Sequence, residues 1–200
     1  MKKLLLIMLL FPCMIYGFSI ESAFSGDNKT HNNLVSIEQA NQYRNTEFLI
    51  SASWQDTNIG QAVKAAYDID YSLDGDYSGF FDVRFNDMPY LSISKRVDLA
   101  AGLGLYLVKI RTFDFKISDG LLLREERLLN SFRARMRFYY SDTIASLMLQ
   151  IVAPEDELTF KINLEQMLLQ KISLVLSYDM IANRKADTFY SYLAGMKVTI

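Results

Sequence analysis

Cysteine, proline and histidine are scarce in this chain. Its 200 residues include one cysteine, three prolines and one histidine. With Cys13 alone, the chain cannot form an intramolecular disulfide or a cysteine-based metal site. The single histidine, His31, lies in a polar segment and is expected to be solvated rather than to act as a general base. These shortages favour a protein that is not an enzyme, without excluding catalysis, and no cofactor or metal is expected.

An excess of charge of one sign is also lacking. The chain has 21 lysine and arginine residues against 23 aspartate and glutamate residues, which gives a formal net charge of −2. Proteins that bind nucleic acid through the phosphate backbone need a basic surface. No nucleic-acid partner is therefore expected.

Long hydrophobic runs are missing after the first residues. Two lysines, an apolar run from Leu4 to Phe11 and a small residue at Gly17 predict a signal peptide over residues 1–17. Cys13 follows the run as a lipidated cysteine would, but Pro12 precedes it where a small residue is usual, so lipidation is the less favoured alternative. No later stretch is long and apolar enough for a transmembrane helix, so a membrane location would require a β-barrel.

What the chain does have is a two-residue alternation of apolar and polar side chains. The alternation extends over residues 46–200, which we predict to be the barrel domain, and turn signals such as Asp74-Gly75 and Asp119-Gly120 interrupt it. Residues 18–45 are polar and are predicted to be a flexible periplasmic segment before the barrel. In a transmembrane β-barrel, alternate residues face lipid and lumen. The predicted fold class is therefore all-β, an antiparallel up-and-down transmembrane β-barrel.

The number of strands depends on how residues 77–95 are divided. If Tyr77 to Lys95 is one long strand, the count is eight, and the shared face of Phe81 and Ile93 supports this. If Pro89 marks a turn, and Glu47 to Trp54 is also counted, the barrel has ten strands. Eight is favoured, because the split leaves a strand shorter than the roughly 9–11 residues that a tilted membrane strand needs.

The alternating last strand and the signal peptide resemble those of small bacterial outer-membrane β-barrel proteins. The resemblance is architectural and covers most of the chain, and no specific family motif is matched. It implies an outer-membrane location, contact with outer-membrane lipid, and recognition of the last strand by the barrel-assembly machinery. The residues expected to form that assembly signal are Tyr192, Ala194, Met196, Val198 and Ile200. Ile200 stands where such strands usually have a terminal phenylalanine.

A soluble periplasmic barrel is the alternative, because alternation alone does not tell inside from outside. Aromatic residues near the predicted strand ends, including Tyr140, Tyr178 and Tyr190, favour the membrane, where such residues form belts at the two interfaces.

An arginine ladder is the sharpest cluster of charge. Arg133, Arg135 and Arg137 are spaced along about 13 Å of one strand face, and Phe132 and Phe138 lie on the opposite face. If the phenylalanines face lipid, the arginines face the lumen. A charge network is predicted there, and its other members are Asp68, Asp70, Asp82, Arg84, Lys161, Glu165, Lys171, Asp179 and Lys197. Because a buried charge is costly unless paired, the favoured interpretation is a network that fills and rigidifies the barrel. The alternatives are an anion-attracting constriction and recognition of a lipid phosphate or carboxylate.

A hairpin over residues 113–129, turning at Asp119-Gly120, is predicted to project outside the cell. Leu121 to Leu123 make it apolar, so it is a candidate site for an extracellular partner, with ordinary hairpin packing as the alternative.

The sequence as a whole favours a non-enzymatic outer-membrane barrel. Its extracellular hairpins would serve envelope integrity, adhesion or partner binding. The main alternative is a narrow, porin-like pore that uses the arginine ladder, and a soluble periplasmic ligand-binding barrel is less favoured.

Overall fold

The computed structural model describes residues 18–27, 31–43, 45–57, 60–73, 75–88, 93–155, 157–183 and 186–199. The predicted signal peptide, residues 1–17 with Cys13, lies outside these ranges, as does Ile200. No helix in the described ranges is long and apolar enough to cross a membrane.

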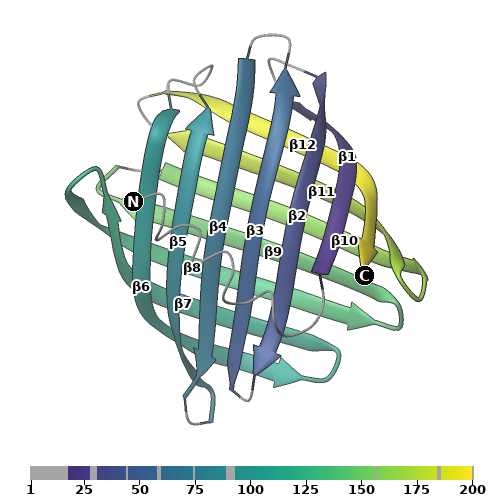
Figure 1. The fold of residues 1–200 in the computed structure, drawn as a ribbon. Helices are drawn as coiled ribbons and strands as arrows, with labels where there is room; N and C mark the ends of the chain where they lie inside the picture. The colour runs from purple at the N-terminus through teal and green to yellow at the C-terminus, as the bar shows by residue number, and fades with distance from the viewer. Residues whose placement is uncertain are drawn as a thin grey trace.

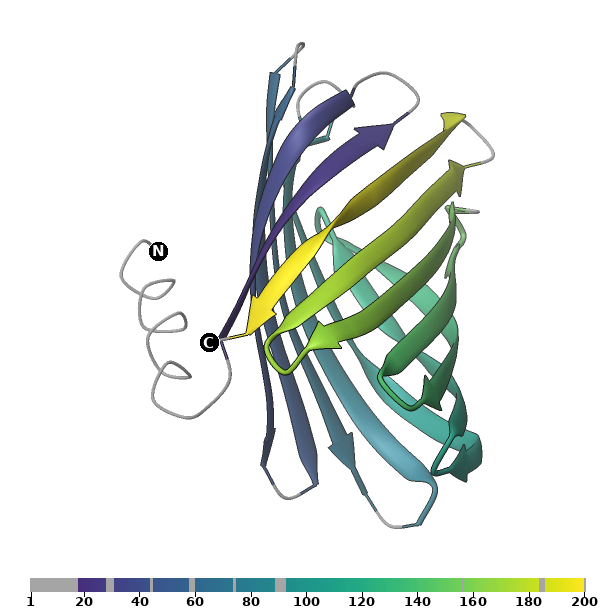
Figure 2. The ribbon, with the colours of Figure 1, turned by 90° about the vertical axis from the view of Figure 1, so that its right-hand side faces the viewer.

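Twelve β-strands make up the described part of the chain. They are β1 (Phe18–Asp27), β2 (His31–Tyr43), β3 (Thr46–Thr57), β4 (Gly60–Ser72), β5 (Tyr77–Met88), β6 (Ile93–Ile110), β7 (Phe113–Arg124), β8 (Arg127–Tyr140), β9 (Thr143–Ala153), β10 (Glu157–Leu169), β11 (Ile172–Asn183) and β12 (Ala186–Thr199). Each strand pairs with its neighbours in the chain (Figure 1), and β12 pairs back with β1 (Figure 2). The closing pair is antiparallel, with Ser19 opposite Thr199. The sheet is therefore a closed up-and-down barrel.

The favoured count of eight strands is wrong. Residues 77–95 are not one strand, because β5 ends at Met88, directly before Pro89, and β6 begins at Ile93. Proline has no N–H to donate to a ladder, so strands commonly end beside it. The alternative count of ten fits residues 46–200, which contain β3 to β12.

Residues 18–45 differ from the predicted flexible segment, because they contain β1 and β2 and raise the total to twelve. Their polar composition hides the strands, but the backbone pairs on both sides: β1 lies between β12 and β2, and β2 lies between β1 and β3. In a closed barrel these ladder hydrogen bonds leave no free edge, and they do not depend on apolar side chains.

The outer face of the wall is apolar and the inner face is largely polar. Leu103 and Phe138 point outwards and are 67% and 48% exposed, whereas Asp114 and Lys116 point inwards and are 5% and 3% exposed. A soluble protein has the opposite arrangement, so this wall suits a hydrocarbon environment. The predicted outward face of 132–140 agrees with this arrangement, since Phe132 is also exposed.

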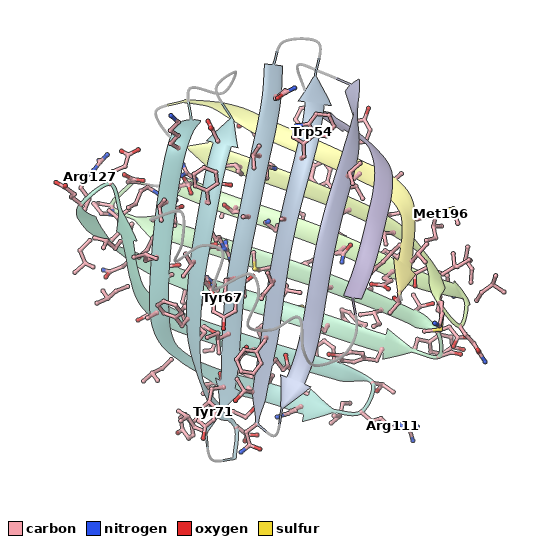
Figure 3. The ribbon with its side chains drawn as sticks, in the orientation of Figure 1. Trp54, Tyr67, Tyr71, Arg111, Arg127 and Met196 are labelled. Atoms are coloured by element: carbon pink, nitrogen blue, oxygen red, sulfur yellow. The ribbon has the colours of Figure 1, made fainter. Side chains whose placement is uncertain are left out.

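Aromatic side chains mark both ends of the outer face. Trp54 on β3 and Tyr71 on the adjacent β4 are both exposed, and they lie towards opposite ends of the barrel (Figure 3). Aromatic residues at the two interfaces are typical of membrane barrels.

The predicted turn at Asp119-Gly120 is wrong. β7 continues through both residues to Arg124, and Gly120 lies opposite Gly102 in the middle of the β6–β7 ladder. The chain turns at Glu125 and Glu126 instead, whose φ angles are +48° and +65°. By contrast, the Asp74-Gly75 signal does mark a connection, between β4 and β5, where Gly75 has a φ of +60°.

Candidate functional site

Three cavities occupy the barrel lumen between the described side chains. The largest of the three, about 550 Å³, lies towards the end of the barrel where β1 begins and β12 ends, and we call it the proximal cavity. The distal cavity, about 120 Å³, lies towards the opposite end, near the β7–β8 turn. The lateral cavity, about 360 Å³, lies against β8 to β12. An apolar cluster from β5 to β9 borders the proximal and distal cavities, and its members are Phe80, Ala100, Leu122, Leu129 and Val152.

The arginine ladder faces this lumen. β8 alternates lipid-facing residues such as Phe132 and Phe138 with Arg133, Arg135 and Arg137, and all three arginines line the proximal cavity. Lys116 on β7 lies opposite Arg135 in the ladder of the two strands and lines the same cavity. Two neighbouring strands thus present four cationic groups to one space.

The acidic partners of these cations come from the opposite wall. Arg133 pairs with Asp82 of β5, and Lys116 pairs with Asp70 of β4. Arg135 Nη2 lies 3.7 Å from the same Asp70 carboxylate. Because β4 and β5 are not adjacent to β8, and β4 is not adjacent to β7, these ion pairs cross the lumen. Charge is segregated across the proximal cavity: four of its five cations lie on β7 and β8, and its four carboxylates lie on β3 to β5 together with Arg84.

Arg137 and Arg84 extend the network at its two ends. The Nη1 of Arg137 lies 3.7 Å from Glu47 of β3, and its Nε donates to Asp114 at 2.9 Å. Arg84 lies on the acidic wall, with its Nη2 3.5 Å from Asp82.

The ladder keeps donor groups that no described residue uses. The Nε atoms of Arg133 and Arg135 are buried without a hydrogen-bond partner in the described part of the chain. The guanidinium of Arg133 lies over the Phe80 ring, 4.6 Å from its centroid, and Arg135 Nη2 donates to the Tyr106 hydroxyl at 3.4 Å. These contacts orient the ladder without neutralising it.

A second cluster, centred on Arg124, lies at the distal end. The buried Arg124 donates two hydrogen bonds to Asp98, at 2.9 and 3.0 Å, two to Glu157, at 2.9 and 3.1 Å, and one to Glu155, at 2.8 Å. It ties β7 to β6, to β10 and to the β9–β10 connection. Sequence reasoning missed this cluster because the turn predicted at Asp119-Gly120 removed Arg124 from the barrel wall.

Most of the predicted network residues line the cavities. Asp68, Asp70, Asp82, Arg84 and the three ladder arginines surround the proximal cavity. Lys161 pairs with Asp179 at 3.6 Å, and Lys197 pairs with Glu165 at 3.2 Å, around the lateral cavity. Lys171 is the exception, because it is exposed in the β10–β11 turn.

Sequence reasoning also omitted Asp114 and Lys116 from the network. The signal was present, since both alternate with Phe113, Phe115 and Ile117 along β7. The predicted assembly-signal residues Tyr192, Met196 and Val198 lie exposed on the outer face of β12; their recognition by assembly machinery remains a prediction.

No protein-family model matches the chain, and comparison with curated proteins found no match in sequence. Solved structures do match its fold. The NanC porin has a TM-score of 0.61 at 11% identity, and the match covers 90% of this chain and 98% of that chain. The KdgM porin in complex with disordered oligogalacturonate gives 0.60 at 9% identity, with the same coverage. Outer membrane phospholipase A from Escherichia coli gives 0.54 at 7% identity, over 94% of this chain and 92% of that chain.

The chain has the fold of bacterial outer-membrane β-barrels. At these identities the likeness concerns the fold alone, and no functional residue is transferred from the matched proteins.

Proposed function

We propose that this protein forms a narrow channel in the bacterial outer membrane that admits small anionic solutes. The observation that carries the proposal is the ladder of Arg133, Arg135 and Arg137, which lines a cavity of about 550 Å³ inside the barrel wall. A cavity of this volume suits a small organic molecule. Arginine suits carboxylates and phosphates, because its planar guanidinium donates paired hydrogen bonds to them.

The distribution of charge in the lumen supports the same class of solute. Ten basic and eight acidic side chains line the three cavities, a formal balance of +2, whereas the whole chain has −2. The basic side chains are Lys64, Arg84, Arg96, Lys116, Arg124, Arg133, Arg135, Arg137, Lys161 and Lys197, and the acidic ones are Glu47, Asp68, Asp70, Asp82, Asp98, Glu157, Glu165 and Asp179. Asp114 and Glu155 line none of these cavities, but they pair with Arg137 and Arg124 and offset this excess. The support therefore comes from the cations gathered on β7 and β8, because a cationic wall in a low-dielectric passage raises the local concentration of anions.

The fold comparison adds support to a transport function. Two of the matched proteins are porins, and one of them is in complex with oligogalacturonate. Oligogalacturonate is a chain of sugar acids and so carries one carboxylate per residue. A ladder of arginines along one wall is chemically suited to an elongated solute of this kind.

Reversal potentials in planar bilayers test the proposal. The wild-type protein, reconstituted under a KCl gradient, is expected to conduct and to prefer chloride over potassium. Arg135→Gln should lower this preference. The ion pair of Arg135 with Asp70 is 3.7 Å long, whereas Arg133 and Arg137 each have a closer carboxylate, and the buried Nε of Arg135 is unused by the described residues. The matched control is Arg111→Gln at an exposed position of the β6–β7 turn, which should leave the preference unchanged. A cation preference in the wild type would refute the proposal.

A closed barrel with a structural or partner-binding function is the second candidate. The ion pairs that cross the lumen and the apolar cluster around Phe80 favour it, because both fill the interior. Its partner surface would lie on the distal turns, including the one at Glu125 and Glu126. Folded, membrane-inserted protein without conductance would support this candidate over the channel.

A further inference from the structure

The proximal and distal cavities share three charged lining side chains. Asp82, Arg84 and Arg133 line both cavities. The proximal cavity has a volume of about 550 Å³ and the distal cavity about 120 Å³. We propose that these three side chains, the constriction triad, form the selectivity filter of the channel, and that Asp82 sets its preference between anions and cations. The inference rests on the proposed channel function.

Asp82 holds the central position of the triad. Its buried carboxylate pairs with Arg133 from across the lumen and lies 3.5 Å from the Nη2 of Arg84 on its own strand. Arg84 also lies 3.6 Å from Asp68 and donates to the Gln150 side chain of β9 at 3.5 Å. One carboxylate therefore neutralises part of two guanidinium groups where the two cavities share their lining.

This arrangement fits what a permeation pathway requires. A filter must bind its solute well enough to admit it and weakly enough to release it. Two arginines without a shared carboxylate would hold an anion tightly, whereas Asp82 weakens that attraction. The Phe80 ring beneath Arg133 fixes the guanidinium beside Asp82 and limits its movement into the cavity.

A second route into the distal cavity passes through the lateral cavity. Lys161 and Asp179 line both of these cavities and pair at 3.6 Å. Their side chains are 42% and 31% exposed, against 12% for Arg133 and 6% for Asp82. Asp82 and Arg133 are thus more buried than the Lys161–Asp179 pair, whereas Arg84, at 28%, resembles Asp179. A charge change at Asp82 therefore acts through less screening water.

Asp82→Asn is the primary test, measured as the reversal potential of the full-length protein in a KCl gradient. The ratio of chloride to potassium permeability should rise about fivefold, the factor that corresponds to about 1 kcal/mol of Coulomb energy. The matched control is Asp114→Asn, which makes the same chemical change at a buried acid paired with Arg137. Asp114 lines none of the three cavities described above, so its substitution should change the ratio much less.

A double variant separates the effect of charge on the permeability ratio from the effect of channel width on the conductance. Asp82→Asn with Arg133→Gln removes the ion pair that crosses the lumen and leaves the net charge unchanged. Its single-channel conductance should exceed that of the wild type, while its permeability ratio stays close to the wild-type value. If Asp82→Asn alone fails to fold, the double variant still tests the inference. A missing gel shift between unheated and boiled samples would reveal that failure to fold.

The outcomes distinguish the inference from the function on which it rests. A wild-type protein that does not conduct, or that prefers cations, overturns the proposed channel. A wild type that conducts and prefers anions, with Asp82→Asn indistinguishable from Asp114→Asn, overturns the inference alone. A larger shift from Asp179→Asn than from Asp82→Asn also overturns it, because the lateral route would then be the filter. An unchanged conductance in the double variant would contradict the inference that the triad narrows the channel.

Discussion

Gly102 and Gly120 face each other on β6 and β7, and neither has room for a β-carbon. A β-carbon on Gly102 would lie 2.2 Å from the carbonyl oxygen of Asp119 and 2.7 Å from the Phe80 ring. Glycine is needed here for close backbone approach rather than for a turn. Since the Phe80 ring also supports Arg133, this pair of glycines influences the geometry of the lumen.

Gly102→Ala should therefore destabilise the folded barrel. Overpacking of a filled interior costs about 1–3 kcal/mol, and the atoms that the new β-carbon would meet include backbone that cannot move aside. The midpoint of unfolding in denaturant, followed by the fluorescence of the single tryptophan, Trp54, measures the effect. Gly79→Ala is the control, because its β-carbon would lie 3.9 Å from the nearest atom and should be tolerated. Equal midpoints for the two variants would contradict the explanation.

Arg124 and Arg127 allow a second comparison of like residues in different surroundings. Arg124 is 6% exposed and is hydrogen-bonded to three carboxylates, whereas the Arg127 side chain is 63% exposed at the edge of the barrel (Figure 3). Removing one partner of a buried ion pair costs about 3–5 kcal/mol, and an exposed pair contributes about 0–1 kcal/mol. We expect Arg124→Gln to lower the free energy of unfolding by several times more than Arg127→Gln, in the same denaturant assay. Similar losses would mean that the Arg124 cluster does not stabilise the distal end.

At the scale of elements, the two Asp-Gly pairs lie in different kinds of structure. Asp74-Gly75 belongs to a connection, where Gly75 has a positive φ, but Asp119-Gly120 lies inside β7. The true turn between β7 and β8 consists of two glutamates with positive φ, a conformation that the sequence does not signal. A local motif does not show whether glycine is there for its φ angle or for its missing side chain.

The position of this turn also predicts which residues are outside the cell. Glu125 lies at the distal end. Ser141, in the β8–β9 turn, lies at the end where β1 begins and β12 ends, which in such barrels faces the periplasm. In intact cells, Glu125→Cys should react with a membrane-impermeant maleimide, and Ser141→Cys should react only after the cells are broken. The wild type, whose Cys13 lies in the predicted signal peptide, is the control. Labelling of Ser141→Cys alone in intact cells would show that the barrel has the opposite orientation.

For the whole molecule, the features that the sequence predicts follow from the two-residue alternation of apolar and polar side chains. The apolar outer face requires alternation in every strand that crosses the membrane. The alternation therefore predicts Phe132 on the outer face and Arg133 on the inner face, where the structure has them. Pairings such as Lys116 with Asp70 could not be predicted, because they join strands that are not neighbours and depend on the number of strands and their stagger. β1 and β2 were missed for a related reason, since a polar strand gives a weak signal even when its backbone is fully paired.

Residues 18–43 therefore provide the most direct test of barrel closure. Ile37 in β2 lies opposite Ile20 of β1 and Ala52 of β3, so its backbone is between two ladders. Proline at this position removes a donor and is not accommodated inside a sheet. If β1 and β2 close the barrel, Ile37→Pro should abolish the gel shift between unheated and boiled protein from purified outer membranes.

Ile50→Pro in β3, which lies in the predicted barrel domain, should have the same effect and is the positive control. A normal shift for Ile37→Pro beside a lost shift for Ile50→Pro would mean that residues 18–43 are not needed for closure. The ten strands of residues 46–200 would then have to close by pairing β3 with β12. That barrel would be narrower, with a different tilt and stagger, and ion pairs that cross the lumen, such as Arg137 with Glu47, would have to rearrange.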